Sequence, residues 1–304
     1  MQSEIQVIRK ASREIVREFG LLESDCAKTG VSYAEGHALL EIDKYDILTA
    51  GQMSVILNLN RSSTARTLQK LKKKGWVQDV PDPDDCKKKP VKLTKSGRKK
   101  VEEINQYSDS RVAKALFFLD KDQVNTAFAG MRDYAKALKL SRVEEQFQIR
   151  PIQKKDNPAI RKIIEKVSAE FSTCGEGGPT ADKELYDMYS AYSKPKSIYF
   201  VVLDQNKVLG GAGIGPLKAS EKGLCEFQKM YFVPQARGRG LGEILMRKCI
   251  AAASEFGYKK MYIETIDRMV QAVNLYIKLG ARKVNEPLGN TGHHQCERMM
   301  VIDL

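Results

Sequence analysis

The sequence predicts two domains, a mainly α domain followed by an α/β domain with a mixed central sheet. A chain of 304 residues exceeds the length of a single typical domain. The first half is mainly helical in pattern, whereas strand-like and helical runs alternate from Phe147 onward. We therefore place the domains at residues 1–145 and 146–304.

The composition is typical of a soluble globular protein, with 42% hydrophobic and 29% charged residues. No apolar run is long enough to cross a membrane, and the N-terminal segment lacks the apolar core of a signal peptide. We therefore expect a cytoplasmic protein without a membrane partner. The six cysteines are scattered along the chain, which predicts reduced thiols and no metal site.

Residues 49–75 predict two helices joined by a polar break. Thr49 is a suitable N-cap for the first, whose apolar positions are Met53, Ile56 and Leu57. The second helix, capped at Ser62 or Ser63 and ended by Gly75, turns Ala65, Leu68 and Leu71 inward. Its outward face carries side chains that suit phosphates and base edges in a major groove, namely Ser63, Arg66, Thr67 and Lys70.

The next segment, VPDPDDCKKKPVKLT, predicts a β-hairpin with a cationic tip at Lys87, Lys88 and Lys89. Trp76 should anchor this hairpin to the core rather than stack on a base. Residues 61–100 hold fourteen Lys and Arg against four Asp, and the whole chain carries a net charge of +13. Such a run could be a solvated face, but a recognition helix followed by a basic hairpin indicates a winged helix-turn-helix, with double-stranded DNA as partner.

At these residues the chain resembles the MarR family of transcription regulators. The resemblance covers residues 1–145 and includes a long first helix, the recognition helix and Leu93-Thr94-x-x-Gly97 opening the next helix. The family's wing usually carries D-x-R, whereas this chain has Asp85-Cys86-Lys87, which keeps the charge without the planar fork. The resemblance also implies a homodimer through residues 3–19 and 97–140. Apolar positions there, which could equally be intradomain core, include Ile5, Ile8, Ile104, Leu116 and Phe117.

The second half alternates strands with helices. Strands are expected at about residues 147–152, 197–204, 207–216, 224–233 and 260–265, and near both ends of 282–304. Helices are expected at about residues 157–171, 182–192, 241–256 and 269–279.

The loop QARGRGLG joins a predicted strand to a predicted helix. Its glycines, Gly238, Gly240 and Gly242, allow backbone N–H groups to face one concavity, and the helix N-terminus adds positive charge. The loop therefore suits a phosphate, or else is simply a turn that opens a helix. A dinucleotide-binding fingerprint would need glycine at Glu243, and no Gly-Lys-Ser or Gly-Lys-Thr of a P-loop occurs in the chain.

Here the chain resembles the GNAT superfamily of acetyl-CoA-dependent N-acetyltransferases, whose [QR]-x-x-G-x-[GA] motif fits Arg237–Gly242. A second family signature, A-x-x-x-Y-x-K-x-G, is met by Ala272, Tyr276, Lys278 and Gly280. Many relatives have Asn at the position of Met269. The resemblance implies acetyl-CoA as cofactor, bound by Met230, Phe232, Arg237, Gly238, Arg239, Gly240, Leu241 and Gly242.

The resemblance also implies a direct attack of an amine on the thioester. Tyr276 is expected to protonate the departing thiolate, although it could be a packing aromatic. Glu226 is expected to take the amine proton, although it could equally be a salt-bridged carboxylate, and Glu264 is the second candidate. A route through Cys225 or Cys296 would need an activating base.

Acidic residues in CGEGGPTADKE, Glu176 and Asp182, could help to bind a cationic acceptor. One of the histidines at 293–294 could line the acceptor pocket. The chain is thus expected to be a dimeric DNA-binding regulator fused to an N-acetyltransferase with an amine acceptor. The alternative is a regulator whose second half senses acetyl-CoA or a metabolite without turnover.

Overall fold

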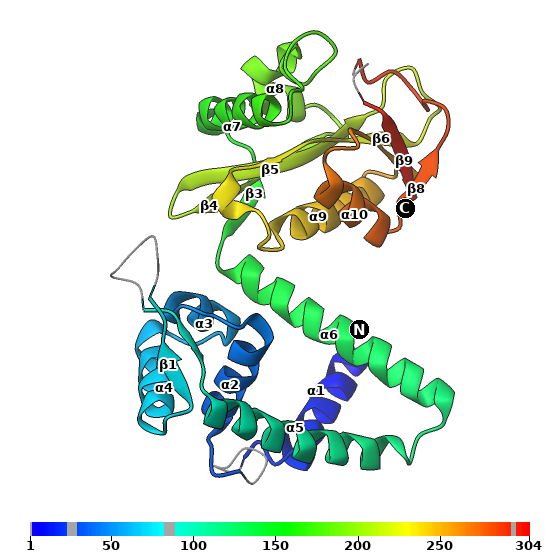
Figure 1. Cartoon of the computed structure of the whole chain (residues 1–304). Coiled ribbons are helices and arrows are strands. Elements are labelled where there is room, and N and C mark those ends of the chain that lie inside the picture. Colours follow the sequence, from blue (N-terminus) through cyan, green and yellow to red (C-terminus); the bar gives the residue numbers. More distant parts are fainter. Residues whose placement is uncertain (1, 23–28, 82–88, 293–295) are drawn as a thin grey trace. The chain divides into compact units, whose positions relative to one another are not determined.

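A computed structural model describes residues 2–22, 29–81, 89–292 and 296–304. The chain forms two compact units, residues 1–128 and 129–304, and the division falls inside the helix α6 (Lys121–Glu145). The sequence placed the boundary at the end of this helix, after residue 145. Figure 1 shows the elements of both units.

The first unit is a helical domain with a short hairpin. Its other helices are α1 (Gln2–Glu18), α2 (Tyr33–Tyr45), α3 (Ala50–Ile56), α4 (Arg61–Lys73) and α5 (Lys95–Leu116). The antiparallel strands β1 (Val77–Asp79) and β2 (Val91–Leu93) form the base of the predicted wing. A core around Leu39, Met53 and Leu71 joins α2, α3 and α4 to the hairpin.

The caps of the first unit explain where its helices begin. Thr49 and Gln52 form a capping box at α3, as the sequence predicts for Thr49. The predicted cap of α4 at Ser62 or Ser63 is wrong, because Asn60 Oδ1 accepts from the backbone N–H of Ser63 at 2.8 Å. The recognition helix therefore starts at Arg61.

The second unit is built on a seven-stranded mixed sheet in the order β3-β4-β5-β6-β7-β9-β8. Its strands are β3 (Gln148–Pro151), β4 (Ile198–Asp204), β5 (Lys207–Pro216), β6 (Leu224–Phe232), β7 (Lys260–Thr265), β8 (Arg282–Val284) and β9 (Arg298–Asp303). Among the strands of the described ranges, β6 and β7 are the pair that runs parallel. The strands predicted from the sequence are confirmed, with ends that differ by at most one residue.

Helices cover both faces of the sheet (Figure 1). They are α7 (Asn157–Glu170) and α8 (Met188–Tyr192) on one face, and α9 (Leu241–Glu255) and α10 (Val270–Lys278) on the other. Tyr199 and Val201 of β4 pack toward α7 and α8, whereas Val202 joins the core beneath α9. The helix predicted at 182–192 is two short pieces, a 3-10 turn at Lys183–Tyr186 and then α8, separated by Asp187.

The structure also bears on the cysteines and on membrane-spanning helices. Cys174, Cys225, Cys249 and Cys296, the cysteines within the described ranges, are free thiols. Among the helices that the structure describes, none combines the length and apolar character that a membrane crossing requires.

Candidate functional site

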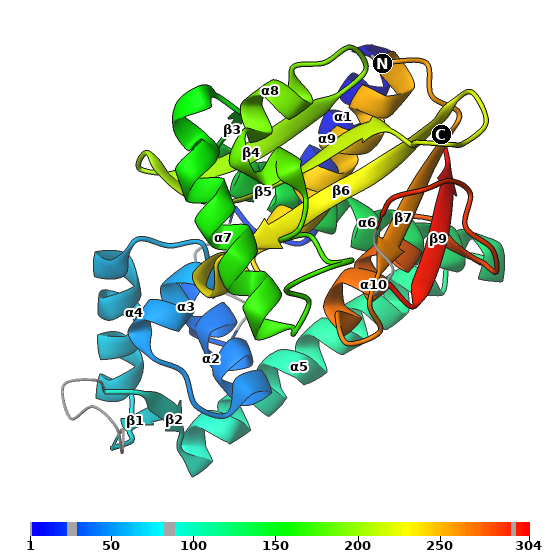
Figure 2. The same cartoon turned by 90° about the horizontal axis from the view of Figure 1, so that it is seen from above.

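The central sheet opens between β6 and β7. The two strands pair only over Leu224–Glu226 and then diverge, as Figure 2 shows. β6 contains a bulge near this divergence. The bulge is seen as a shift in the pairing register with β5 between Gly211 and Gly213. Lys229 adopts a positive φ of 53° at the bulge, and Tyr199 Oη donates to its carbonyl oxygen at 2.9 Å. The bulge thus turns side chains of β6 toward the opening.

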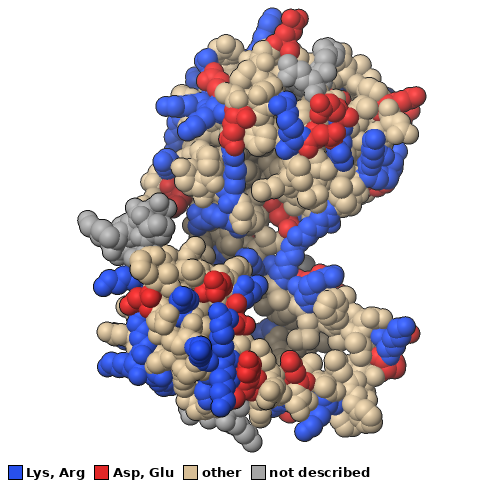
Figure 3. Space-filling model, in the orientation of Figure 1, with Lys and Arg blue, Asp and Glu red and all other residues tan. Residues whose placement is uncertain are grey.

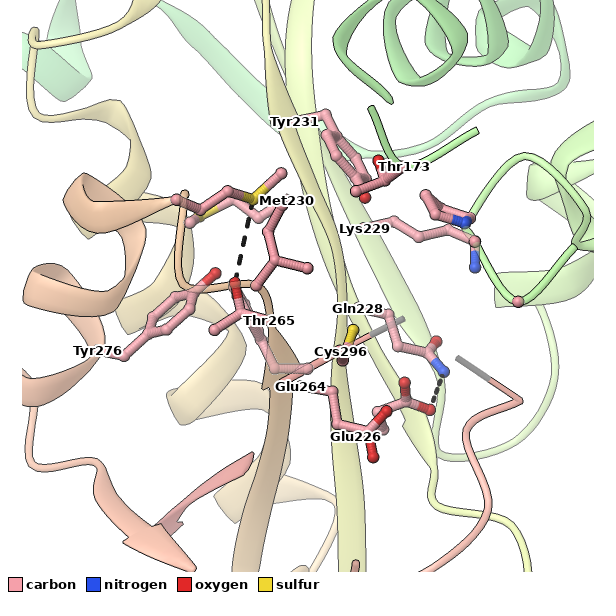
Figure 4. A pocket seen from close by; sticks show the side chains of 16 residues that line it. Thr173, Glu226, Gln228, Lys229, Met230, Tyr231, Glu264, Thr265, Tyr276 and Cys296 are labelled. Atoms are coloured by element: carbon pink, nitrogen blue, oxygen red, sulfur yellow. Dashed lines mark hydrogen bonds between the residues drawn. The ribbon is translucent and has the colours of Figure 1, made fainter. Parts of the chain in front are cut away.

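A pocket fills this opening. Its walls come from β6, β7, α10 and the loop that precedes α8, and they are Thr173, Gly177, Gly178, Pro179, Glu226–Tyr231, Glu264–Ile266, Met269, Tyr276 and Cys296. In Figure 4, Tyr276 enters from α10, and the carboxylates of Glu226 and Glu264 lie together away from it. The predicted acid and both predicted bases therefore line one pocket, with the acid apart from the two bases.

Both carboxylates are held by neighbours. Glu226 is only 6% exposed, and its Oε2 accepts from Gln228 Nε2 at 2.7 Å. Glu264 accepts from Tyr262 Oη at 2.7 Å and also from the hydroxyl of Thr291. Glu226 is thus a buried group on the pocket wall rather than a surface carboxylate.

Tyr276 is a pocket residue and a packing residue at once. Its ring meets Phe227 edge to face, with the centroids 5.9 Å apart. Burial, followed by the nearby Tyr231 and Cys296, raises the pKa of the Tyr276 hydroxyl well above its usual value. The phenol therefore stays protonated at neutral pH, as a proton donor must.

The glycine loop begins α9 in the left-handed conformation that favours glycine. Gly238 and Gly240 have φ values of 72° and 90°, and Gly240 is the N-cap without a capping side chain. The first N–H groups of α9 have no partner within the helix. A Cβ on Gly242 would lie 3.4 Å from Leu275, and the loop and α10 together line one cleft.

This cleft adjoins the pocket. It is lined by the glycine loop, the end of β6 and the start of α10, and it shares three wall residues with the pocket, namely Met230, Tyr231 and Met269. The predicted cofactor residues Met230, Phe232, Arg237, Gly238, Gly240, Leu241 and Gly242 all line the cleft. A linear molecule bound at the loop could therefore reach Tyr276.

The two loop arginines contact protein groups. Arg237 forms a two-pronged ion pair with Glu170, at 2.5 and 2.7 Å, and donates to the Phe232 carbonyl at 3.0 Å. Arg239 lies over the ring of Phe147, 4.5 Å from its centroid, and does not line the cleft. The side chain of Arg237 thus fixes the loop to β6 and α7, which leaves backbone N–H groups as the anion-facing donors.

The two cysteines considered as nucleophiles, Cys225 and Cys296, are both protonated. Cys225 is fully buried in the core, and its thiol donates to the Lys260 carbonyl at 3.6 Å. Burial, the largest cause, raises the pKa of Cys225 to about 12. Cys296 does line the pocket, but burial and then Glu264 and Glu226 raise its pKa to about 12 as well. Both thiols are protonated at neutral pH and are poor nucleophiles.

The acidic loop residues do not lie together at the pocket. Asp182 forms an ion pair with Lys229, whose side chain is 3% exposed. Glu176 is exposed and is not a wall residue. The histidines at 293–294 lie outside the described residues.

The recognition helix presents a basic face. Lys and Arg side chains gather on the face of the first unit that carries α4, at the lower left of Figure 3. The exposed cations of this helix are Arg61, Arg66, Lys70 and Lys73. Lys89 is exposed too, whereas Asp85, Cys86, Lys87 and Lys88 lie outside the described residues. Trp76 packs partly buried against the core, as predicted.

Two side chains of α4 face opposite to the prediction. Ala65 is exposed, whereas Thr64 and Thr67 are buried. The Thr67 hydroxyl donates to the Ser63 carbonyl at 3.1 Å, which occupies its proton within the helix. Thr64, Thr67, Leu68 and Leu71 are spaced three and four residues apart and form the buried stripe of the helix. Thr67 is therefore a core residue, and Ser63, Arg66 and Lys70 stay on the accessible side.

The long helices of the first unit expose apolar side chains. No described residue of α1 is buried, and Ile5 and Ile8 are 49% and 43% exposed. Leu116 and Phe117, at the end of α5, are 40% and 83% exposed. Ile104 differs, because it is buried in the core of its own unit.

Sequence reasoning missed three residues of the pocket region. They are Gln228, which bonds to Glu226, Tyr192, which bonds to Gln228, and Lys229, which carries the bulge. Residues two apart on a strand share a face, so Glu226 on β6 could have indicated Gln228. Nothing local in the sequence marks Tyr192 or the bulge.

Comparisons with known proteins cover both units. Residues 161–281 match the acetyltransferase (GNAT) family model, and residues 29–86 match the MarR family model.

Individual proteins are similar to each half of the chain. YjgM, an uncharacterized N-acetyltransferase of Escherichia coli (strain K12), is 42% identical over 157 residues, which are 51% of this chain and 94% of that protein. A phosphinothricin acetyltransferase from Sinorhizobium meliloti, solved with AcCoA, is 21% identical with a TM-score of 0.45, covering 52% of this chain and 89% of that one. A mutant MarR from Escherichia coli complexed with operator DNA is 22% identical with a TM-score of 0.38, covering 43% of this chain and 95% of that one.

Proposed function

Because this chain belongs to the GNAT family in its C-terminal half and to the MarR family in its N-terminal half, we propose that it is a DNA-binding regulator and an acetyl-CoA-dependent N-acetyltransferase. The observation that carries the proposal is that the cleft at the glycine loop and the pocket at Tyr276 share the wall residues Met230, Tyr231 and Met269. Each of the two cavities suits a different part of the cofactor.

The pyrophosphate of acetyl-CoA would bind at the N-terminus of α9. Gly238 and Gly240 turn the backbone there, and the helix N-terminus favours an anion. The pantetheine arm would run along Met230 and Phe232, beside the opening between β6 and β7. The thioester would then lie in the pocket near Tyr276.

The transfer would proceed by direct attack of a neutral amine on the thioester carbonyl. Glu226 would take the amine proton, since an alkylammonium with a pKa of about 10 is mostly charged at neutral pH. A backbone N–H of β6 near Phe232 would polarise the carbonyl. Tyr276 would protonate the thiolate of coenzyme A as the C–S bond breaks.

The first unit would bind double-stranded DNA as a homodimer. Ser63, Arg66 and Lys70 of α4 would face the major groove, and the wing lysines Lys87, Lys88 and Lys89 would contact phosphates. The exposed apolar residues of α1 and the end of α5 would form the contact between two copies of the chain.

Calorimetric titration with acetyl-CoA tests the cofactor site, with Gly240→Glu as the matched variant. Saturable binding to the parent that the variant loses would support the site. Release of free thiol is then followed with spermidine, lysine, kanamycin and a lysine-containing peptide as acceptors. Binding with background thiol release from every amine would favour a sensor without turnover, and no binding to the folded parent would contradict both functions of the second unit.

A further inference from the structure

The Glu226 carboxylate is the end of a line of hydrogen bonds that runs through the side chains of Gln228 and Tyr192. Gln228 Nε2 donates to Glu226 Oε2 at 2.7 Å, and Tyr192 Oη donates to Gln228 Oε1 at 2.8 Å. Glu226 and Gln228 line the pocket, whereas Tyr192, on α8, is outside its walls. The dashed line in Figure 4 marks the bond between Gln228 and Glu226.

The hydrogen bonds of this line can donate in one direction only, from Tyr192 through Gln228 to Glu226. An ionised carboxylate only accepts hydrogen bonds, so Gln228 must turn its NH₂ group to Glu226 and its carbonyl oxygen to Tyr192. The Tyr192 hydroxyl must then donate. Burial, followed by Tyr199 and nearby acidic groups, raises the pKa of Tyr192 well above its usual value, so the hydroxyl keeps its proton.

The far end of the line is itself held in place. Tyr192 is 6% exposed, and its ring packs on that of Tyr199 with the centroids 5.0 Å apart. Tyr199 Oη donates to the carbonyl of Lys229, the residue that carries the β6 bulge. The two tyrosines therefore support both the bulge that opens the pocket and the carboxylate beside it.

We propose that Gln228 and Tyr192 are positioning residues that hold Glu226 in place to deprotonate the acceptor amine. The inference rests on the proposed role of Glu226. Glu226 takes one proton from the ammonium, which frees the lone pair that bonds to the thioester carbon. The C–S bond then breaks as Tyr276 gives its proton to sulfur, and the second proton that the nitrogen loses restores the Tyr276 hydroxyl. A base must lie within hydrogen-bond reach of that proton, and misplacement by about 1 Å can cost about 100-fold in rate.

The test compares Tyr192→Phe and Gln228→Leu with the parent, and uses Tyr258→Phe as the matched control. Tyr258 likewise donates its hydroxyl to a carbonyl oxygen, here the backbone carbonyl of Lys196 at 3.0 Å, and it is not a pocket wall residue. With the fastest acceptor of the amine panel, kcat should fall about 10-fold in Tyr192→Phe and about 100-fold in Gln228→Leu. The Kd for acetyl-CoA should stay at the parental value in all three variants.

Nitrogen-15 NMR of the Gln228 side-chain amide gives a readout that needs no acceptor. Its NH₂ resonances should shift in Tyr192→Phe and not in Tyr258→Phe. Unchanged resonances in Tyr192→Phe would overturn the hydrogen-bonded line directly.

Glu226→Gln separates failure of this inference from failure of the proposed function. If Glu226→Gln abolishes turnover while Tyr192→Phe and Gln228→Leu behave like the control, Glu226 acts without their help and the inference is wrong. If Glu226→Gln retains the parental kcat, or if the parent acetylates no amine of the panel, the proposed role of Glu226 fails and the positioning role falls with it.

Discussion

The ammonium of Lys136 lies 2.5 Å from the carboxylate of Glu243, so the second half of α6 supplies a cation to the first turn of α9. Glu243 also accepts from Arg247 at 3.0 Å and from Lys278 at 3.2 Å. The carboxylate is only 6% exposed and follows directly after the glycine loop. Lys278 of the family signature is therefore one of three cations that α6, α9 and α10 direct at one carboxylate.

Stability should depend on pH through Glu243. Burial alone would raise its pKa, but the bonds from Lys136, Arg247 and Lys278 hold the pKa below the ordinary value of 4.5. The ionised carboxylate thus contributes stability above pH 4.5, and this contribution is lost as the pH falls through the lowered pKa. Hydrogen exchange of α9 peptides at pH 7 and at decreasing pH should show less protection toward acid.

Glu243→Gln should remove that acid dependence and cost about 2 kcal/mol at pH 7, since three cations remain around a neutral amide. Glu165→Gln is the control, because its ion pair with Arg161 is exposed, and it should cost less than about 1 kcal/mol. Equal effects of the two variants on urea unfolding would contradict a structural role for Glu243.

Two alanine substitutions in the glycine loop should differ in severity. Gly238→Ala and Gly240→Ala both place a side chain at positive φ, which costs about 1–2 kcal/mol. At Gly238 the new methyl group meets open space, whereas at Gly240 it would lie 3.0 Å from Leu140. Calorimetry should therefore show the larger loss of acetyl-CoA affinity in Gly240→Ala, and a larger loss in Gly238→Ala would count against this account.

Removal of the Tyr276 hydroxyl should slow the chemical step and spare cofactor binding. We expect Tyr276→Phe to lower kcat about 100-fold, the scale of general acid catalysis, with an unchanged Kd for acetyl-CoA. Because burial raises the pKa of this phenol above 10.0, the Tyr276 hydroxyl of the parent should stay protonated, and kcat should not fall through its ionisation, up to that pH. A fall in kcat below pH 10 that disappears in Tyr276→Phe would show that the hydroxyl ionises earlier.

DNA affinity should follow the exposed cations of α4. Arg66→Ala and Lys70→Ala should each reduce the slope of log K against log salt by about 1. Thr67→Ser is the contrasting variant, since Thr67 is buried and its hydroxyl bonds within the helix. It should lower Tm slightly and leave the binding to a random duplex unchanged in a fluorescence titration.

The apolar face of α1 should control the oligomeric state. Ile5→Lys combined with Ile8→Lys should raise the Kd of dimer formation about 100-fold or more, because burial of each side chain contributes about 1.5–3 kcal/mol. Val55→Lys changes a residue of α3 that is 71% exposed and should leave sedimentation velocity profiles as in the parent. A monomeric parent would refute the proposed dimer.

The sequence by itself determined the order and type of the elements. Runs such as EFQKMYFV and EILMRKCIAAASEF specify β6 and α9 because their apolar spacing is a local property of the chain. The loop between them predicted a turn with backbone at positive φ, which glycine tolerates without strain, and Gly238 and Gly240 adopt it. The buried face of α4 was harder to predict, since Ala65 and Thr67 flank the apolar positions Leu68 and Leu71 and only packing against the rest of the first unit decides which of the two turns inward.

The tertiary structure decided which side chains meet. Lys136 and Glu243 are 107 residues apart, and Tyr192 and Gln228 are 36 apart, so no local pattern relates them. The bulge at Lys229 depends on pairing between β5 and β6 and on the hydroxyl of Tyr199. Periodicity and turn chemistry act over a few residues, whereas the position of a buried carboxylate depends on every element that packs around it.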